Sequence, residues 1–246
     1  MKKNKKTRVN LIKLIEVFDE RNDIYKGHTT PIIGFIGEDL NAAIFADYLI
    51  RRGKIKNVEI LPYPVNTGQE RVRGRELDRW IKAGNILYQT EIKSWCSFLA
   101  GKGRYKLPLG ATEQEMKESA NKKWEIELNE HFNNIKTFGK VSKVLDKMKV
   151  PDDLIKKFKK VEVEPLVIHW MPISKKEAMP FSRTKLKDLG LDKKFAKQIQ
   201  KDFTAVNYFS CSLYIRELIN KDKRKYLDLD LPNVSERVNI MEKLMK

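Results

Sequence analysis

Three charged residues, Asp78, Glu91 and Lys93, are of the types that can hold a metal ion and act on a phosphate ester. Asp78 lies in the segment GRELDRWI (74–81), and Glu91 and Lys93 lie in the segment ILYQTEIKSW (86–95). Both segments contain the β-branched and aromatic residues that are typical of strands. The sequence therefore predicts one acid on one strand and an acid with a lysine on the next.

Side chains alternate between the two faces of a strand, so Gln89, Glu91 and Lys93 are expected on the same face. Residues 82–85 (KAGN) form a plausible hairpin turn between the two strands. If the strands pair through this turn, Asp78 can lie beside Glu91.

Two neighbouring carboxylates repel each other unless a cation lies between them, and carboxylate oxygens suit Mg²⁺, for which Mn²⁺ is expected to substitute. A water bound to such an ion can hydrolyse a phosphodiester bond. Lys93 would orient that water or offset the extra charge of the transition state. Gln89 is expected near the nucleophile or the phosphate.

This arrangement resembles the PD-(D/E)XK, or restriction-endonuclease-like, nucleases, whose core runs αβββαβ. The resemblance rests on Asp78, twelve intervening residues and then Glu91-Ile92-Lys93, with Glu38 on a preceding helix. It implies that Asp78, Glu91 and the Ile92 carbonyl bind the metal, that Lys93 is the catalytic lysine and that Glu38 is an accessory acid. Leu77 stands where the family name has proline, and the later helix lacks the Gln-x-x-x-Tyr of the exonuclease-like branch.

Hydrophobic periodicity predicts the elements that would position these residues. We expect a helix over 8–20, then a loop containing Gly27, Pro31 and Gly34, and a second helix over 37–54. Further helices are expected within 111–147, from Ser210 and, packed on the fold, at the end of the chain. The expected strands are 58–65, 74–81, 86–95, 163–173 and 205–209. The expected fold class is α/β, an αβββαβ core with a mixed central sheet flanked by helices. The core covers 35–172, after an N-terminal helix and loop (1–34) and before a lysine-rich, mostly helical extension packed on the core (173–246).

The charge balance favours nucleic acid as the partner, because 50 Lys and Arg residues against 33 Asp and Glu residues give a net charge of +17. A lysine-rich proteome is the alternative reading. Phosphate contacts are expected around Asp78 and in the glycine-bearing loop after the second strand, where ordinary solubility is again the alternative. The candidate residues are Arg71, Arg73, Arg75 and Arg79, and Lys102, Arg104 and Lys106.

Cysteine usage and hydropathy indicate the compartment. The two cysteines, Cys96 and Cys211, are not spaced for a zinc site or a disulfide scaffold. No apolar run approaches the roughly 20 residues of a membrane span. We therefore expect a cytoplasmic protein that does not enter the membrane.

The hypothesis that follows is an Mg²⁺-dependent nuclease acting on DNA in preference to RNA, in restriction, defence, repair or mobile-element processing. The resemblance adds the expectation of a homodimer. One alternative is a catalytically silent nucleic-acid-binding protein on the same fold, and another is a basic structural protein with an accidental E-x-K. For the three charged residues, a solvated strand face with cross-strand ion pairs is the competing reading. Glu38 would equally stabilise a helix start, and His169 is read as a hydrogen-bonded core histidine.

Overall fold

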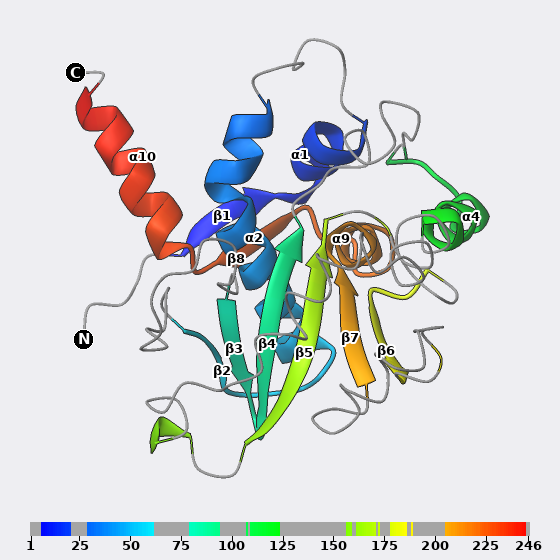
Figure 1. Cartoon of the computed structure of the whole chain (residues 1–246). Helices are drawn as coiled ribbons and strands as arrows, with labels where there is room; N and C mark the ends of the chain where they lie inside the picture. Colours follow the sequence, from blue (N-terminus) through cyan, green and yellow to red (C-terminus); the bar gives the residue numbers. More distant parts are fainter. Residues whose placement is uncertain are drawn as a thin grey trace, which may run out of the picture.

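A computed structural model describes residues 6–20, 29–61, 79–93, 107, 109–123, 156–158, 161–170, 172, 178–185, 188 and 205–244. These residues form a mixed α/β fold around a six-stranded sheet (Figure 1). The strand order is β2-β3-β4-β5-β7-β6. The strands are β2 (Val58–Ile60), β3 (Arg79–Ala83), β4 (Ile86–Lys93), β5 (Glu162–His169), β6 (Phe181–Lys185) and β7 (Ala205–Ser210).

The sheet contains both parallel and antiparallel neighbours. Neighbours β2, β3 and β4 are antiparallel, whereas β4, β5 and β7 run parallel to one another, and β6 is antiparallel to β7. The two residues Gly84 and Asn85 make the turn between β3 and β4. Gly84 has a φ of 58°, a conformation that glycine adopts without the steric cost of a side chain. The predicted hairpin between these two strands is thus confirmed, but Lys82 and Ala83 belong to β3 and not to the turn as predicted.

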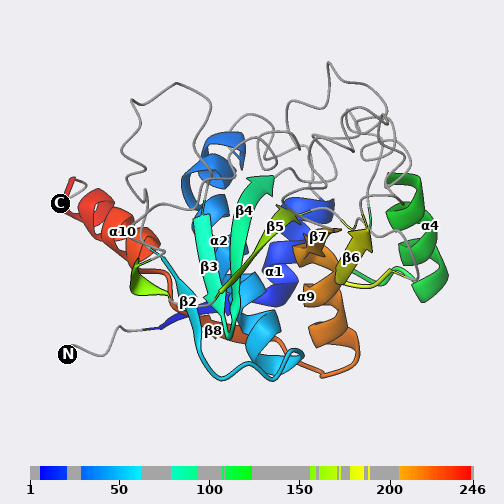
Figure 2. The same ribbon diagram turned by 60° about the horizontal axis from the view of Figure 1, so that its bottom comes forward.

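Helices α2 (Thr29–Arg51) and α9 (Cys211–Asn220) lie against one face of the sheet (Figures 1 and 2). Helix α1 (Leu11–Ile15) packs beside α9 and continues into a π-helical turn, η1 (Glu16–Glu20). A separate two-stranded ribbon joins β1 (Thr7–Asn10) to β8 (Tyr226–Leu229). Helix α4 (Glu113–Lys123) lies beyond the β6 edge of the sheet, and α10 (Pro232–Leu244) lies on the other side of the molecule (Figures 1 and 2).

The main core lies between the sheet and these helices, and aromatic rings fill its centre. Phe45 of α2 contacts the ring of Tyr88 edge-on at 5.3 Å between centroids and that of Phe209 at 4.9 Å. Tyr48, one helical turn later, meets Tyr214 of α9 edge-on at 5.2 Å. Edge-to-face pairs of this kind add to the free energy gained by burying apolar surface.

The opposite face of the sheet carries a smaller apolar cluster. Leu61, Trp80 and Leu87 are buried together, and Phe158, Val161 and Val163 pack against them. Trp80 and Leu87 belong to this cluster, whereas their neighbours Ile81 and Tyr88 belong to the main core. Since side chains alternate along a strand, these four residues show which face every other residue of β3 and β4 is on.

The structure corrects two predicted helix starts. The expected loop up to Gly34 is wrong, because α2 already begins at Thr29. Pro31 falls in its first turn, where proline removes no helical hydrogen bond. At the N-terminus the helix begins at Leu11, after a short strand, because the Asn10 side chain accepts hydrogen bonds from the amides of Ile12 and Lys13 at 3.0 and 3.1 Å.

The C-terminal third also differs in part from the prediction. The strand over Ala205–Ser210 and the helix capped by the Ser210 hydroxyl are confirmed. Strand β6 was not predicted, and both β6 and β7 belong to the same sheet as β5. The apolar residues of α10 were expected to pack on the fold. Val234 packs against the main core, whereas Val238, Ile240, Met241 and Leu244 are exposed.

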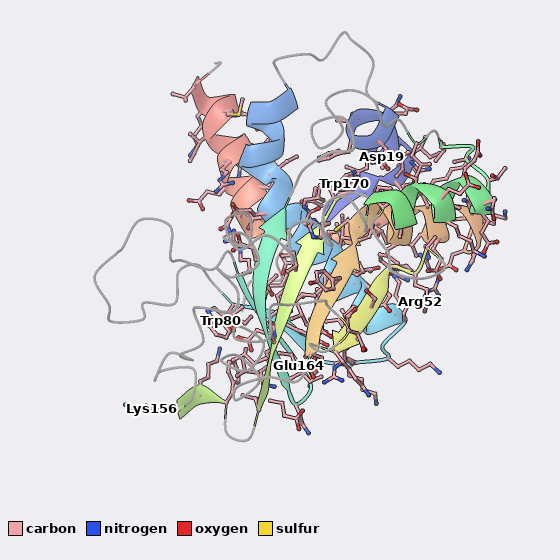
Figure 3. All side chains as sticks on the ribbon, turned by 45° about the vertical axis from the view of Figure 1, so that its right-hand side comes forward. Asp19, Arg52, Trp80, Lys156, Glu164 and Trp170 are labelled. Atoms are coloured by element: carbon pink, nitrogen blue, oxygen red, sulfur yellow. The ribbon has the colours of Figure 1, made fainter. Side chains whose placement is uncertain are left out.

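A buried network of polar side chains ties the N-terminal segment to the end of β5 and to α9. The Asp19 carboxylate accepts hydrogen bonds from the Trp170 indole at 3.0 Å, from the Ser212 hydroxyl and from the Arg216 guanidinium at 2.9 Å. Arg216 also donates to the Leu107 carbonyl. Figure 3 shows Asp19 and Trp170 next to each other. The side chains of Asp19 and Arg216 are 0% and 1% exposed, so each charge depends on the other.

We expect Arg216→Ala to lower the free energy of unfolding by about 3–5 kcal/mol, because it leaves the Asp19 carboxylate buried without its cation. Arg8→Ala is the control, since Arg8 pairs with Asp228 in solvent and such pairs contribute about 1 kcal/mol or less. Urea unfolding of both variants measures the difference. Equal losses in the two variants would show that the buried pair does not hold these segments together.

Candidate active site

Strand β4 presents two chemically different faces. Tyr88 and Ile92 point into the main core beneath α2 and α9, whereas Leu87 lies in the cluster on the opposite face. Alternation therefore puts Gln89 and Glu91 on the face opposite α2. The prediction that these two residues share a strand face is confirmed.

Both of these polar side chains are buried, Gln89 to 0% and Glu91 to 3% exposure. A carboxylate removed from water costs free energy unless a cation or hydrogen bonds compensate it. The reading of this face as a solvated one therefore does not hold for Glu91. Lys93 is the last residue of β4, and the structure describes its place in the strand alone.

Further polar residues occur on the same face in the neighbouring parallel strands. Glu91 is in register with Val167, and Val167 is in register with Tyr208. Lys93 is in register with His169. Ligands of open α/β sheets bind at the carboxyl ends of the strands, and this row lies at those ends of β4, β5 and β7.

Two of these residues, His169 and Tyr208, are buried. Burial raises the pKa of the Tyr208 phenol well above its ordinary value, so the phenol is neutral at physiological pH. The burial of His169 agrees with its reading as a core residue, and its predicted hydrogen bond stays a prediction. The sequence analysis missed Tyr208, although the alternation of β7 could have assigned it to this face.

Glu38 and its neighbour Asp39 both contact Arg79, the first residue of β3. Arg79 donates to Asp39 at 2.6 Å and lies 3.6 Å from the Glu38 carboxylate. Asn233 and Arg237 of α10 approach the same Asp39 carboxylate at 3.2 and 3.8 Å. The start of β3 is thus fixed to α2, next to the peptide bond that joins Arg79 to Asp78.

These contacts correct two predictions. Glu38 is not near the start of a helix, because α2 begins nine residues before it, so a contribution to the helix dipole is excluded. Arg79 was a candidate for gripping phosphate, but its side chain is only 6% exposed and is engaged by carboxylates. The pairing of Arg79 with Asp39 was not foreseen.

The remaining predicted residues fall outside the described part of the chain. They are Asp78, Arg71, Arg73, Arg75, Lys102, Arg104 and Lys106. Within the described residues, no group of three His, Cys, Asp or Glu side chains is arranged to hold a metal ion. Asp78 lies outside these residues, so the pair of Asp78 and Glu91 stays a prediction.

Comparisons with protein-family models, with curated proteins and with solved structures find no match to this chain. None of the helices in the described ranges has the length and apolar composition needed to cross a membrane.

The two acids beside Arg79 should differ in their contribution to stability. We expect Asp39→Asn to lower the free energy of unfolding by about 2–4 kcal/mol, because it weakens the mostly buried pair with Arg79. Glu38→Gln should change it by less than about 1 kcal/mol, since 47% of the Glu38 side chain is exposed. Chemical unfolding of both variants tests this. A larger loss for Glu38→Gln would make Glu38 a structural residue.

Tyr88, whose side chain is buried on the face of the sheet opposite Glu91, should make the free energy of unfolding depend on pH. The pKa of Tyr88 is raised to about 12, mainly by burial and further by the nearby Glu164 carboxylate. A tyrosine with a raised folded pKa contributes stability that is present below the unfolded pKa of about 10 and is lost as the pH rises through about 12. Between pH 9 and 11 the wild type should lose about 1 kcal/mol more than Tyr88→Phe. Identical losses would contradict the burial of this phenol.

Proposed function

We propose that this chain is a metal-dependent nuclease of the PD-(D/E)XK type that hydrolyses phosphodiester bonds of DNA. The observation that carries the proposal is the register of the hairpin between β3 and β4. Arg79 pairs with Thr90 and Trp80 pairs with Gln89. Since paired positions change by one in opposite directions along an antiparallel ladder, the next pair of the same ladder would join Asp78 to Glu91.

Covalent geometry supports this pair. The Asp78 Cα lies within about 3.8 Å of the Arg79 Cα, because one peptide bond joins them. Residues directly opposite each other on antiparallel strands have Cβ atoms about 4.5–5.5 Å apart. Two carboxylates at that separation can bind one cation between them.

The order and direction of the elements also support the proposal. Helix α2 comes first, followed by the antiparallel strands β2, β3 and β4 and then by β5, which runs parallel to β4. Helix α4 lies in the crossover between β4 and β5. This is the αβββαβ order that the resemblance implies, with Glu91 on the third strand of the meander and Asp78 directly before the second in the sequence.

The donor set fits a hard divalent cation. Glu91 offers a buried carboxylate, and buried carboxylates favour a site in which a cation offsets their charge. Asp78, Glu91 and the Ile92 carbonyl would hold Mg²⁺ or Mn²⁺ through oxygen atoms. Glu38 belongs to α2, which covers the other face of the sheet, and it contacts Arg79, so it is not part of the proposed ligand set. The bound ion supplies a water of lowered pKa and offsets charge on the phosphate.

The other residues act on the substrate. The Lys93 ammonium offsets the negative charge that develops on the phosphate in the transition state. The Gln89 amide orients the attacking water or a phosphate oxygen. Arg71, Arg73 and Arg75 with Lys102, Arg104 and Lys106 bind the phosphate backbone on either side of the scissile bond.

Cleavage assays of supercoiled plasmid, linear duplex, single-stranded DNA and RNA test the proposal. We expect the wild type to cut DNA with Mg²⁺ or Mn²⁺ and not with EDTA. Glu91→Gln, Asp78→Asn and Lys93→Met should each lower the rate by about 10²-fold or more, because each removes charge stabilisation at the reacting phosphate. Glu59→Gln and Lys185→Met are the matched controls, because these residues lie on other strands, β2 and β6.

Cleavage that survives Glu91→Gln would overturn the proposal. Binding of DNA by a wild type that cuts none of these substrates would instead favour a nucleic-acid-binding protein on the same fold. The net charge of +17 favours this second function, because it attracts nucleic acid whether or not the chain cleaves it.

A further inference from the structure

Two loops on the far side of the helices from Glu91 carry a cluster of exposed basic side chains. The first loop follows α2 and contains Lys54 and Lys56, and the second follows α9. The second loop contributes Lys221, Lys223, Arg224 and Lys225. We call these six residues the two-loop surface.

The two loops are held together by ion pairs and by their own backbones. Arg52 donates to both oxygens of Asp222 at 2.9 and 3.0 Å and lies 3.1 Å from Glu217. The Asp222 hydrogen bond is the main cause that raises the pKa of Arg52. The amides of Ile55 and Arg224 donate back to α2 and α9 at 3.1 and 2.9 Å. These contacts hold the backbones of the two loops that carry the six basic residues.

The carboxylates around these loops are already engaged. Arg51 donates to both oxygens of Asp47 at 2.9 Å, and the Tyr214 hydroxyl donates to the same group at 2.7 Å. Glu217 and Asp222 are taken by Arg52. In the described part of the chain, the six cations of the two-loop surface have no ion pair. Their positive charge is therefore uncompensated by the described residues.

The two-loop surface lies away from the candidate active site. It extends from the ends of α2 and α9, which cover one face of the sheet, whereas Glu91 is on the opposite face. Figure 3 labels Arg52 and Trp80, a residue of the Glu91 face, to either side of the strands. A sheet and a helix layer each add about 10 Å of thickness. A straight duplex held at Glu91 would not reach the loops.

We propose that the two-loop surface binds the phosphate backbone of a nucleic-acid segment other than the one at the active site. Four of the six cations lie within residues 221–225, in the turn and loop that follow α9. Cations this close together in the chain can neutralise neighbouring phosphates. Neutralising them releases counterions, which is the main driving force of non-specific binding to nucleic acid.

A membrane surface fits these loops less well. Anionic lipids attract basic residues, but stable binding also needs apolar side chains that insert between the headgroups. Ile50 and Tyr226 are the exposed large apolar residues adjoining the loops. The guanidinium of Arg8 lies over the Tyr226 ring at 5.6 Å, which leaves one aliphatic side chain for insertion.

The test measures binding of a fluorescein-labelled 30-base-pair DNA duplex in EDTA, so that no cleavage occurs. The variant combines Lys54→Gln, Lys221→Gln, Lys223→Gln and Lys225→Gln. The control removes four exposed lysines from separate parts of the chain, Lys6, Lys156, Lys185 and Lys243, each replaced by glutamine. Both proteins lose the same net charge.

For the two-loop variant we expect the slope of log Kd against log salt concentration to fall by about 2–4, at about 0.9 for each phosphate that the protein no longer neutralises. The control should change the slope by less than about 1. Equal changes in both proteins, no change in either, or binding by the wild type to anionic vesicles but not to the duplex would each overturn the proposal. The proposed cleavage activity is measured separately, so failure of one proposal is distinguishable from failure of the other.

Discussion

The carboxylate of Asp19, which has no contact with water, determines how the segments around the end of β5 are arranged. Asp19 comes from the N-terminal segment, Trp170 follows β5, and Ser212 and Arg216 come from α9. A buried charge is tolerated only when its partners stay in place, so these elements cannot shift independently. The same end of the sheet carries the carboxyl ends of β4 and β5, where Glu91 and His169 lie. The network therefore gives the candidate site a rigid frame.

Under the proposed function, one face of β4 serves stability and the other serves chemistry. Tyr88 and Ile92 pack against α2 and α9 and stabilise the sheet through apolar and aromatic contacts. Gln89 and Glu91 are buried on the other face, where polar side chains cost free energy unless other groups compensate them. These buried polar residues are the ones that the proposed function assigns to the metal ion and the phosphate. The pairing of Arg79 with Asp39 fixes the start of β3 beside this face.

The parts of the fold that depend on local sequence could be predicted, and those that depend on distant contacts could not. Strand alternation placed Gln89 with Glu91, and the Gly84 turn fixed the hairpin register. Pro31 and Gly34 suggested a loop, yet proline is accepted in the first turn of a helix. Strand β6 (FSRTK) has little apolar character and depends on pairing with β7. The spacing of apolar residues in α10 predicted a helix but not whether another element covers it. The contact between Arg79 and Asp39 joins residues 40 positions apart, which no local pattern encodes.

The most direct test of the account is to measure Mn²⁺ binding by isothermal titration calorimetry, without nucleic acid, for the wild type, Asp78→Asn and Glu91→Gln. If the two acids share one cation, the wild type binds Mn²⁺ with one high-affinity site, and each substitution weakens that site by at least about tenfold, because each removes a charged oxygen ligand. Unchanged Mn²⁺ affinity in both variants would show that Asp78 and Glu91 do not form a metal site and would contradict the account.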